Sequence, residues 1–274
     1  MALLETDGIT MRFGGLVAVA DFRVRIEEGE LVGLIGPNGS GKTTVFNMIT
    51  GIYRPTQNRV RFLDRDITGE RPDRITALGI ARTFQNIRLL NSLSVLDNVM
   101  VAHHVRLRST PWEAMFRLPR YVREERLMRE DSERLLELVD LHTVRDASAG
   151  SLPYGRQRRL EIARAIATTP KLLLLDEPAA GMNPQETNAL MEFIQRIRRE
   201  FDLTIFIIEH DMKVIMGICE RILVLDYGVT IAQGTPEEIQ GDRKVIEAYL
   251  GTEWAGGARG RAEQGSTPEE KHDA

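Results

Sequence analysis

The chain has 274 residues, of which 42% are hydrophobic and 28% charged, a composition typical of soluble globular proteins rather than fibrous or disordered ones. A formal net charge of −4 excludes an overall positive charge that would attract the whole chain to nucleic acid or anionic lipid. The single cysteine, Cys219, excludes an internal disulfide and a site of several thiolates. Apolar runs fall far short of the roughly 20 residues of a membrane-spanning helix, and Met1–Glu5 reaches an acid too early for a signal peptide. We therefore expect a cytoplasmic protein.

The first ninety residues are predicted to form short strands joined by turns. Residues 22–26 alternate apolar and charged side chains, which indicates a half-exposed strand, whereas the continuous apolar run at 31–35 indicates a buried one. Another short strand is expected over 60–62, and a turn at 71–73 leads to a helix over 75–78.

A helical, arginine-rich segment is predicted from residue 93 to about residue 141. Apolar residues within 121–141 recur at three- and four-residue spacings among many charges, which is typical of an amphipathic helix. The arginines are interleaved with Trp112, Phe116 and Tyr121. This pattern leaves open a solvated helical face, or a surface for a permease, lipid headgroups or nucleic acid.

From residue 156 onward, helices alternate with buried strands. The expected helices cover 156–167 and 184–199, and the expected strands cover 172–175, 204–208, 221–225 and 229–232. Apolar strands spaced by helices imply a parallel sheet covered on both faces. Residues 251–274 are rich in Gly, Glu, Arg, Ser and Pro, so we expect a disordered tail there.

A glycine-rich loop with the spacing G-x-x-x-x-G-K-T follows the predicted strand at 31–35 and precedes a helical stretch at 44–50. In that context, backbone N–H groups converge on a phosphate at the start of a helix. Lys42 is expected to reach the β and γ phosphates, and the Thr43 hydroxyl to bind Mg²⁺. The expected ATP-binding residues in this loop are Gly36, Pro37, Asn38, Gly39, Ser40, Gly41, Lys42, Thr43 and Thr44.

Four polar residues outside the loop are candidates for the same site. Asp176 and Glu177 end a buried strand, where Asp176 suits Mg²⁺ and Glu177 suits polarisation of an attacking water. His210 follows another strand and can hold a phosphate and water, and the Gln85 amide oxygen can reach Mg²⁺. None of these residues is persuasive alone, since adjacent acids are common at strand ends and the other two could be ordinary polar residues.

The order of these motifs resembles that of an ATP-binding subunit of an ABC transporter, over about residues 3 to 250. The resemblance rests on the phosphate loop, Gln85, the basic stretch Leu152–Glu161, the stretch Leu172–Pro178 and His210. Four further segments and the long helical stretch between residues 85 and 150 resemble the branched-chain amino-acid importer subgroup. These segments are Arg82–Asn86, Tyr154–Arg164, Asp176–Pro184 and Ala248–Gly251.

The resemblance implies an α/β fold with a P-loop ATPase core. It implies a mixed sheet, an N-terminal antiparallel β subdomain and a helical subdomain inserted at about 87–168, all within one ATPase domain over 1–250. The implied function is ATP hydrolysis that drives import of branched-chain amino acids or related compounds. The implied location is the cytoplasmic face of the inner membrane, where the chain would be peripheral.

The resemblance also implies roles for single residues and a set of partners. Phe13 would stack on adenine, Gln85 would sense the γ-phosphate, Glu177 would be the catalytic base and His210 the switch residue. Mg²⁺ would be held by Thr43, Gln85 and Asp176. ATP would bind between two ATPase subunits, each facing its partner's signature motif, here Pro153, Tyr154, Gly155 and Arg156. Polytopic permease subunits and, indirectly, a substrate-binding protein complete the expected partners, with no nucleic acid.

Two residues depart from the general family pattern. Pro153 stands where the usual Leu-Ser-Gly-Gly-Gln signature has serine, and it offers neither a hydroxyl nor an N–H to the partner's γ-phosphate. Asn183 stands where an aspartate usually contacts the partner. We therefore expect a heterodimer with a different ATPase subunit rather than a homodimer, although Pro153 also suits the start of a helix and Gly155 alone could suffice.

Two other functional classes remain as alternatives. An ABC-type ATPase acting on DNA or ribosomes would be expected to carry long coiled coils, zinc modules or two cassettes, which this sequence lacks. A P-loop kinase for a small metabolite would have no evident use for Gln85, Gly155 and His210. The transported substrate itself is not encoded in this chain.

Overall fold

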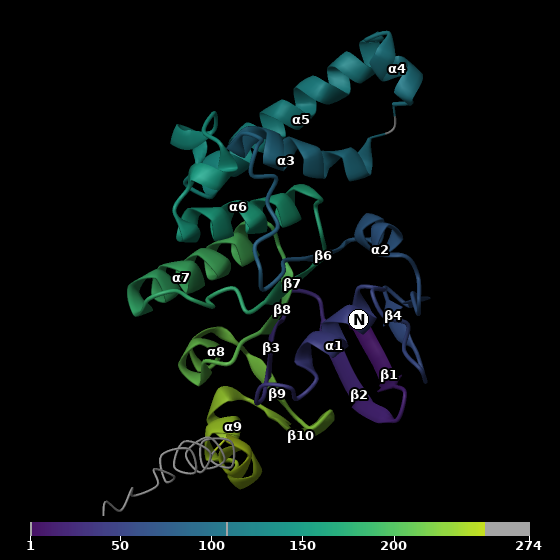
Figure 1. Ribbon diagram of the computed structural model, residues 1–274, viewed down its shortest axis with the longest axis vertical. Coiled ribbons are helices and arrows are strands. Elements are labelled where there is room, and N and C mark those ends of the chain that lie inside the picture. Colours follow the sequence, from purple (N-terminus) through teal and green to yellow (C-terminus); the bar gives the residue numbers. More distant parts are fainter. Residues whose placement is uncertain (1, 108, 250–274) are drawn as a thin grey trace, which may run out of the picture.

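The computed structural model describes residues 2–107 and 109–249, and two sheets organise it (Figure 1). The central sheet has the strand order β10-β9-β3-β8-β7-β6. Neighbours from β9 to β6 are parallel, and β10 pairs antiparallel with β9, so the sheet is mixed, as predicted. Its strands are β3 (Leu31–Ile35), β6 (Ile80–Arg82), β7 (Leu172–Asp176), β8 (Thr204–Ile208), β9 (Arg221–Asp226) and β10 (Val229–Gly234).

The second sheet is antiparallel, with the order β2-β1-β4-β5. Its strands are β1 (Ala2–Phe13), β2 (Leu16–Glu27), β4 (Val60–Phe62) and β5 (Arg65–Asp66). The twelve-residue strand β1 was not foreseen in the sequence, because several register shifts along its pairing with β2 break the simple alternation of buried and exposed side chains. The antiparallel N-terminal sheet implied by the family resemblance is confirmed.

The helices cover the central sheet and form a lobe that extends away from it (Figure 1). Helices α3 to α6 make up this helical lobe, with α4 at its far end, and all four follow β6 and precede β7 in the chain. The helices are α1 (Lys42–Ile49), α2 (Pro72–Leu78), α3 (Val95–His103), α4 (Pro111–Met115), α5 (Pro119–Leu138), α6 (Tyr154–Ala167), α7 (Pro184–Glu200), α8 (Met212–Ile218) and α9 (Pro236–Gly241). No helix among the described residues is long and apolar enough to cross a membrane.

The core consists of two apolar layers, one on each face of the central sheet. Leu172 and Leu174 of β7 pack into the layer shared with α1 and the antiparallel sheet. Leu173 and Leu175 pack into the layer shared with α6, α7 and the helical lobe. Since successive side chains of a strand point to opposite faces, a run of four leucines serves both layers. Because β3, β7 and β8 are parallel, their carboxyl ends lie at one edge of the central sheet.

The domain boundaries expected from the sequence stay predictions. The helical lobe begins with Ser94, whose hydroxyl caps α3, and ends with α6 at Ala167, within the expected 87–168. The expected tail at 251–274 lies outside the described residues.

Candidate functional site

The glycine-rich loop lies between β3 and α1, and its glycines are required by the backbone. Gly36, Gly39 and Gly41 have φ angles of 150°, 80° and 105°, a region that residues with a Cβ rarely adopt. A Cβ at Gly36 would also clash with the carbonyl oxygen of Leu225, and one at Gly41 would lie 2.6 Å from that of Ala18. The loop is thus held tightly against β9 and β2 and directed at the start of α1.

Lys42 closes this loop from inside. Its Nζ donates hydrogen bonds to the carbonyl oxygens of Gly36 at 2.7 Å and Pro37 at 2.9 Å. The residue is only 5% exposed. Burial lowers the pKa of the Lys42 ammonium, and the nearby carboxylates of Glu177 and Asp176 partly oppose this. The loop therefore contains a buried cation at the position where a phosphate would approach.

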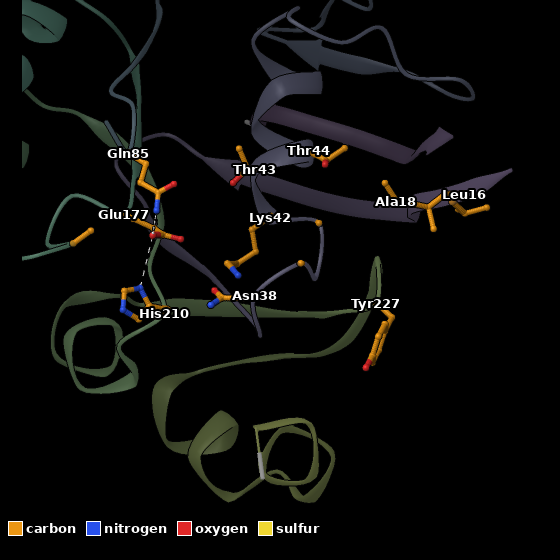
Figure 2. A pocket seen from close by; sticks show the side chains of 14 residues that line it. Leu16, Ala18, Asn38, Lys42, Thr43, Thr44, Gln85, Glu177, His210 and Tyr227 are labelled. Atoms are coloured by element: carbon orange, nitrogen blue, oxygen red, sulfur yellow. Dashed lines mark hydrogen bonds and ion pairs between the residues drawn. The ribbon is translucent and has the colours of Figure 1, made fainter. Parts of the chain in front are cut away.

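A cavity of about 880 Å³ opens beside the loop and collects side chains from distant parts of the chain (Figure 2). It brings Lys42 and Thr43 together with Gln85, Glu177 and His210, which were predicted from separate motifs. Its other lining residues are Leu16, Val17, Ala18, Asn38, Gly39, Gly41, Thr44, Ala180 and Tyr227. Gly36, Pro37 and Ser40 belong to the loop without lining the cavity.

Glu177 is fixed at the centre of this group. Its Oε2 accepts a hydrogen bond from Nε2 of Gln85 at 2.8 Å and lies 3.9 Å from Nδ1 of His210 (Figure 2). The backbone of Glu177 has φ of 45°, a left-handed conformation that costs a residue with a side chain roughly 1 kcal/mol. Such strain is typical of functional positions, and here it turns the carboxylate toward the cavity.

Asp176 lies behind the cavity and is engaged by an arginine. Its Oδ2 is 2.7 Å from Nη2 of Arg82, and both side chains are almost completely buried. Nη1 of Arg82 also donates to Oδ1 of Asn47 at 2.7 Å. Burial lowers the pKa of the Arg82 guanidinium, and the Asp176 carboxylate partly restores it. This arginine, whose role was not foreseen, joins β6, β7 and α1 beneath the site.

The cavity offers oxygen ligands that suit Mg²⁺. The Thr43 hydroxyl and the Gln85 amide both line it. Mg²⁺ prefers hard oxygen ligands and usually keeps waters and substrate phosphates with one or two protein groups, so these two residues fit. Asp176 does not line the cavity, and its carboxylate contacts Arg82 instead. No cluster of three or more His, Cys, Asp or Glu side chains able to hold a metal occurs in the described part of the chain.

A third carboxylate, Glu209, supports the site from behind and was missed in the sequence. It is 1% exposed, and its Oε1 accepts a hydrogen bond from the backbone N–H of Ala179 at 2.8 Å. Its Oε2 lies 3.8 Å from Nδ1 of His210. Burial raises the pKa of Glu209, and the Ala179 N–H and His210 oppose this. The sequence feature that could have indicated Glu209 is its position as an acid directly before His210, at the end of a fully buried strand.

The basic motif at 153–156 lies away from the cavity. Pro153 is the residue before α6, and its carbonyl oxygen accepts from the N–H groups of Arg156 and Gln157 at 2.9 and 3.0 Å. A separate depression of about 290 Å³ is lined by Pro153, Gly155 and Arg156 together with residues of α7. Within one chain, this motif and the phosphate loop therefore form two distinct surfaces.

Tyr154 and Arg158 connect the start of α6 to the site. The Tyr154 hydroxyl donates to the carbonyl oxygen of Ala180 at 3.0 Å and accepts from Nη2 of Arg158 at 3.1 Å. Arg158 is fully buried and donates to the carbonyl oxygens of Phe84 at 2.7 Å and Gln85 at 2.8 Å. The start of α6 is thereby tied to both segments that carry Gln85 and Glu177.

Arg158 forms a buried ion pair that also fixes the chain after Gln85. Its Nη1 is 2.7 Å from Oε2 of Glu161, which is 6% exposed. Oε1 of Glu161 accepts a hydrogen bond from the backbone N–H of Arg88 at 3.1 Å. The sequence showed Arg158 and Glu161 only as part of a basic helix, because the backbone groups that they contact lie more than 70 residues earlier in the chain.

Phe13 and Asn183 occupy positions of their own. Phe13 does not line the cavity; it pairs with Leu16, which does, and its ring meets Tyr53 edge-on at 5.3 Å. Asn183 caps α7, because its side chain accepts from the Glu186 N–H at 2.9 Å. Tyr227, a highly exposed aromatic residue in the lining, was not foreseen.

Comparisons with known proteins agree on one family. A model described as ABC transporter matches residues 19–180, and one described as branched-chain amino acid ATP-binding cassette transporter matches residues 229–255. The chain is 46% identical over 249 residues to the high-affinity branched-chain amino acid transport ATP-binding protein BraF of Pseudomonas aeruginosa, covering 91% of this chain and 98% of that protein. It is 44% identical over 249 residues, with the same coverage, to the corresponding protein LivG of Escherichia coli K12.

A solved structure agrees with these sequence relatives. The ADP conformation of an ATP-binding cassette of an ABC transporter superimposes with a TM-score of 0.80 at 31% identity, covering 92% of this chain and 99% of that chain. A nucleotide-free cassette of an ABC transporter gives a TM-score of 0.78 at 30% identity, over 91% of this chain and 99% of that one.

Proposed function

Because the chain belongs to the ABC transporter family of ATP-binding proteins, and is an ATPase of that family, we propose that it powers an importer of branched-chain amino acids or related compounds. The observation that carries this proposal is the convergence of the phosphate loop, Glu177, Gln85 and His210 on one cavity. Similarity to proteins described as branched-chain amino acid transport ATP-binding proteins supports the choice of substrate class.

In the proposed reaction, the triphosphate lies along the loop at 36–43. The Lys42 ammonium exchanges its hydrogen bonds to the carbonyl oxygens of Gly36 and Pro37 for hydrogen bonds to β- and γ-phosphate oxygens. Water attacks the γ-phosphorus, the bond from that phosphorus to the bridging oxygen breaks, and the water proton passes to Glu177. Gln85 and His210, which contact Glu177, orient that water.

Mg²⁺, held by Thr43 and Gln85 with Asp176 behind them, would neutralise charge on the phosphates. Asp176 serves best as an acceptor that keeps Arg82 in place. The donor set, a hydroxyl and an amide oxygen beside phosphates, supports this assignment.

We further propose that two ATPase subunits enclose each nucleotide and that the partner is a different chain. The separate surface at Pro153, Gly155 and Arg156 supports a site completed by a second subunit. Pro153 has no N–H and no hydroxyl, so it forgoes charge-assisted hydrogen bonds of about 1.5–3 kcal/mol each toward the partner's γ-phosphate. If the partner carries a complete signature, the site formed by that signature and this chain's Glu177 hydrolyses ATP efficiently.

The remaining partners follow from the same proposal. Polytopic permease subunits transmit the effect of hydrolysis, and a substrate-binding protein selects the cargo. The chain would then sit at the cytoplasmic face of the inner membrane, attached to the permease.

The test separates binding from hydrolysis. In the assembled transporter, Glu177→Gln should retain ATP binding and lose at least about 100-fold in hydrolysis, as expected when a general base is removed. Lys42→Ala, the matched variant, should lose binding itself. Retained hydrolysis in Glu177→Gln would contradict the base assignment, and transfer of the phosphate to a metabolite instead of its release would indicate a kinase.

Co-purification tests the partners. The tagged chain, extracted from membranes of its host in mild detergent, should carry a second, distinct ATPase and one or two polytopic proteins. Recovery as a homodimer would overturn the heterodimer, and recovery with nucleic acid or ribosomal proteins would overturn the transporter role while leaving the ATPase chemistry in place.

A further inference from the structure

Helix α4 and the start of α5 form the far end of the helical lobe (Figure 1), and their apolar side chains are exposed. Trp112, Met115 and Phe116 are 68%, 71% and 66% exposed, and Leu118 and Val122 are exposed as well. The rings of Trp112 and Phe116 stack with centroids 6.5 Å apart and planes at 16°. We call these five residues the apolar tip. Apolar side chains gathered in this way mark a contact with another molecule.

The most exposed charged side chains beside the apolar tip are arginines, because the acidic side chains there are less exposed and are used within the fold. Glu113 accepts hydrogen bonds from the backbone N–H of Thr110 at 2.6 Å and from its hydroxyl at 3.0 Å, which closes the cap of α4. Glu124 accepts from the backbone N–H of Ser109 at 3.1 Å. These two glutamate side chains are 19% and 25% exposed. Arg117 lies 3.8 Å from Glu125, and its side chain is 75% exposed against 38% for that of Glu125.

Two more arginines extend the positive surface along α5. Arg120 lies 3.8 Å from Glu113 and 3.6 Å from Glu124, and its side chain is still 54% exposed. Arg123, one turn further on, is exposed, and no ion pair to it occurs in the part of the chain that the structure describes. Apolar side chains and guanidinium groups therefore face solvent together at one end of the lobe.

We propose that the apolar tip and Arg117, Arg120 and Arg123 dock on an anionic lipid surface. The rings and aliphatic side chains enter the headgroup layer, where Trp and other amphipathic groups are favoured. The guanidinium groups pair with lipid phosphates, and each contributes about fivefold to binding near an anionic leaflet. The choice of a membrane surface rests on the proposed function, since a transporter ATPase works beside one.

Other occupants match this surface less well. Cytoplasmic loops of membrane proteins carry an excess of Lys and Arg, which these arginines would repel. A second copy of this chain would bring the same arginines against one another. A nucleic acid would pair with the arginines but leave Met115, Leu118 and Val122 in water.

Vesicle flotation of the full chain, without ATP and without permease, tests the proposal. The chain should bind vesicles of phosphatidylcholine with phosphatidylglycerol and dissociate from them in high salt. It should not bind vesicles of phosphatidylcholine alone. Neutralising the three arginines to glutamine should lower the affinity on the order of 100-fold. Trp112→Ser with Phe116→Ser should lower it at least about tenfold. The matched controls, which should bind normally, are Arg71→Gln/Arg74→Gln/Arg243→Gln and Val229→Ser/Ile246→Ser, all at exposed positions outside the lobe.

Fluorescence gives a readout at the tip itself. The chain has two tryptophans, so Trp254→Phe leaves Trp112 as the reporter. Its emission should shift to the blue on anionic vesicles and stay unchanged on neutral ones.

Three results would overturn the inference: no binding to anionic vesicles, binding that the tip variants and the controls share equally, or capture of nucleic acid in place of vesicles. ATP hydrolysis by the assembled transporter, measured separately, keeps the two proposals apart. Absent vesicle binding with intact hydrolysis counts against lipid docking alone, whereas absent hydrolysis with intact vesicle binding counts against the proposed function alone.

Discussion

Replacing Arg158 with methionine should destabilise the fold through the charge that it leaves behind. Methionine keeps most of the volume, but Glu161, 6% exposed, loses the guanidinium 2.7 Å from its Oε2. The carbonyl oxygens of Phe84 and Gln85 also lose their donors. Removing one partner of a buried ion pair costs about 3–5 kcal/mol, so we expect a loss of that size in the free energy of unfolding.

The double variant Arg158→Met/Glu161→Gln separates the unpaired charge from the lost hydrogen bonds. A glutamine at 161 still accepts from the Arg88 N–H but carries no charge. The remaining loss is then the two carbonyl hydrogen bonds, roughly 2 kcal/mol in total. Urea unfolding followed by circular dichroism measures both variants. Equal losses in the single and the double variant, or a loss below about 1 kcal/mol in the single one, would refute a buried charge pair as the link between α6 and the Gln85 segment.

Three further changes test other parts of the site. Pro153→Ser supplies a hydroxyl and an N–H to the partner's site and should raise ATP turnover by the assembled transporter; unchanged turnover would remove the basis for asymmetry. Phe13→Ala should weaken binding of ATP and GTP about fivefold or more, as loss of a stacking partner does, and leave the affinity for tripolyphosphate unchanged; equal losses for all three would exclude stacking. Because the pKa of Glu209 is raised above its ordinary value of 4.5, its ionised form costs stability, so the contribution of Glu209 to wild-type stability should fall as pH rises from 4.5 through the raised pKa. Glu209→Gln lacks this pH-dependent loss, so its free energy of unfolding in urea, relative to wild type, should increase as pH rises. An increase as pH falls would contradict the burial argument.

Local patterns in the sequence predicted the central sheet well. Strands at 31–35 and 204–208 coincide with β3 and β8, because unbroken aliphatic runs leave no doubt about which residues are buried on both faces. The phosphate loop was recognisable because its glycine and lysine spacing follows from backbone geometry that few other residues permit.

Contacts between segments distant in the chain could not be predicted in this way. The ion pair between Arg82 and Asp176 joins positions 94 apart, and Glu209 reaches Ala179 across the ends of two strands. Nothing in the local pattern distinguishes such a buried charge from a solvated one. The long strand β1 escaped notice for a related reason, since its bulges hide the alternation that marks a strand.

The most direct test of the proposed function is uptake of labelled leucine by the host strain lacking this chain. Wild-type protein should restore uptake, and Glu177→Gln, present at the same level in the membrane and still binding ATP, should not. Restoration by Glu177→Gln, or leucine uptake that does not depend on this chain at all, would contradict the conclusion that hydrolysis at Glu177 drives the import of branched-chain amino acids.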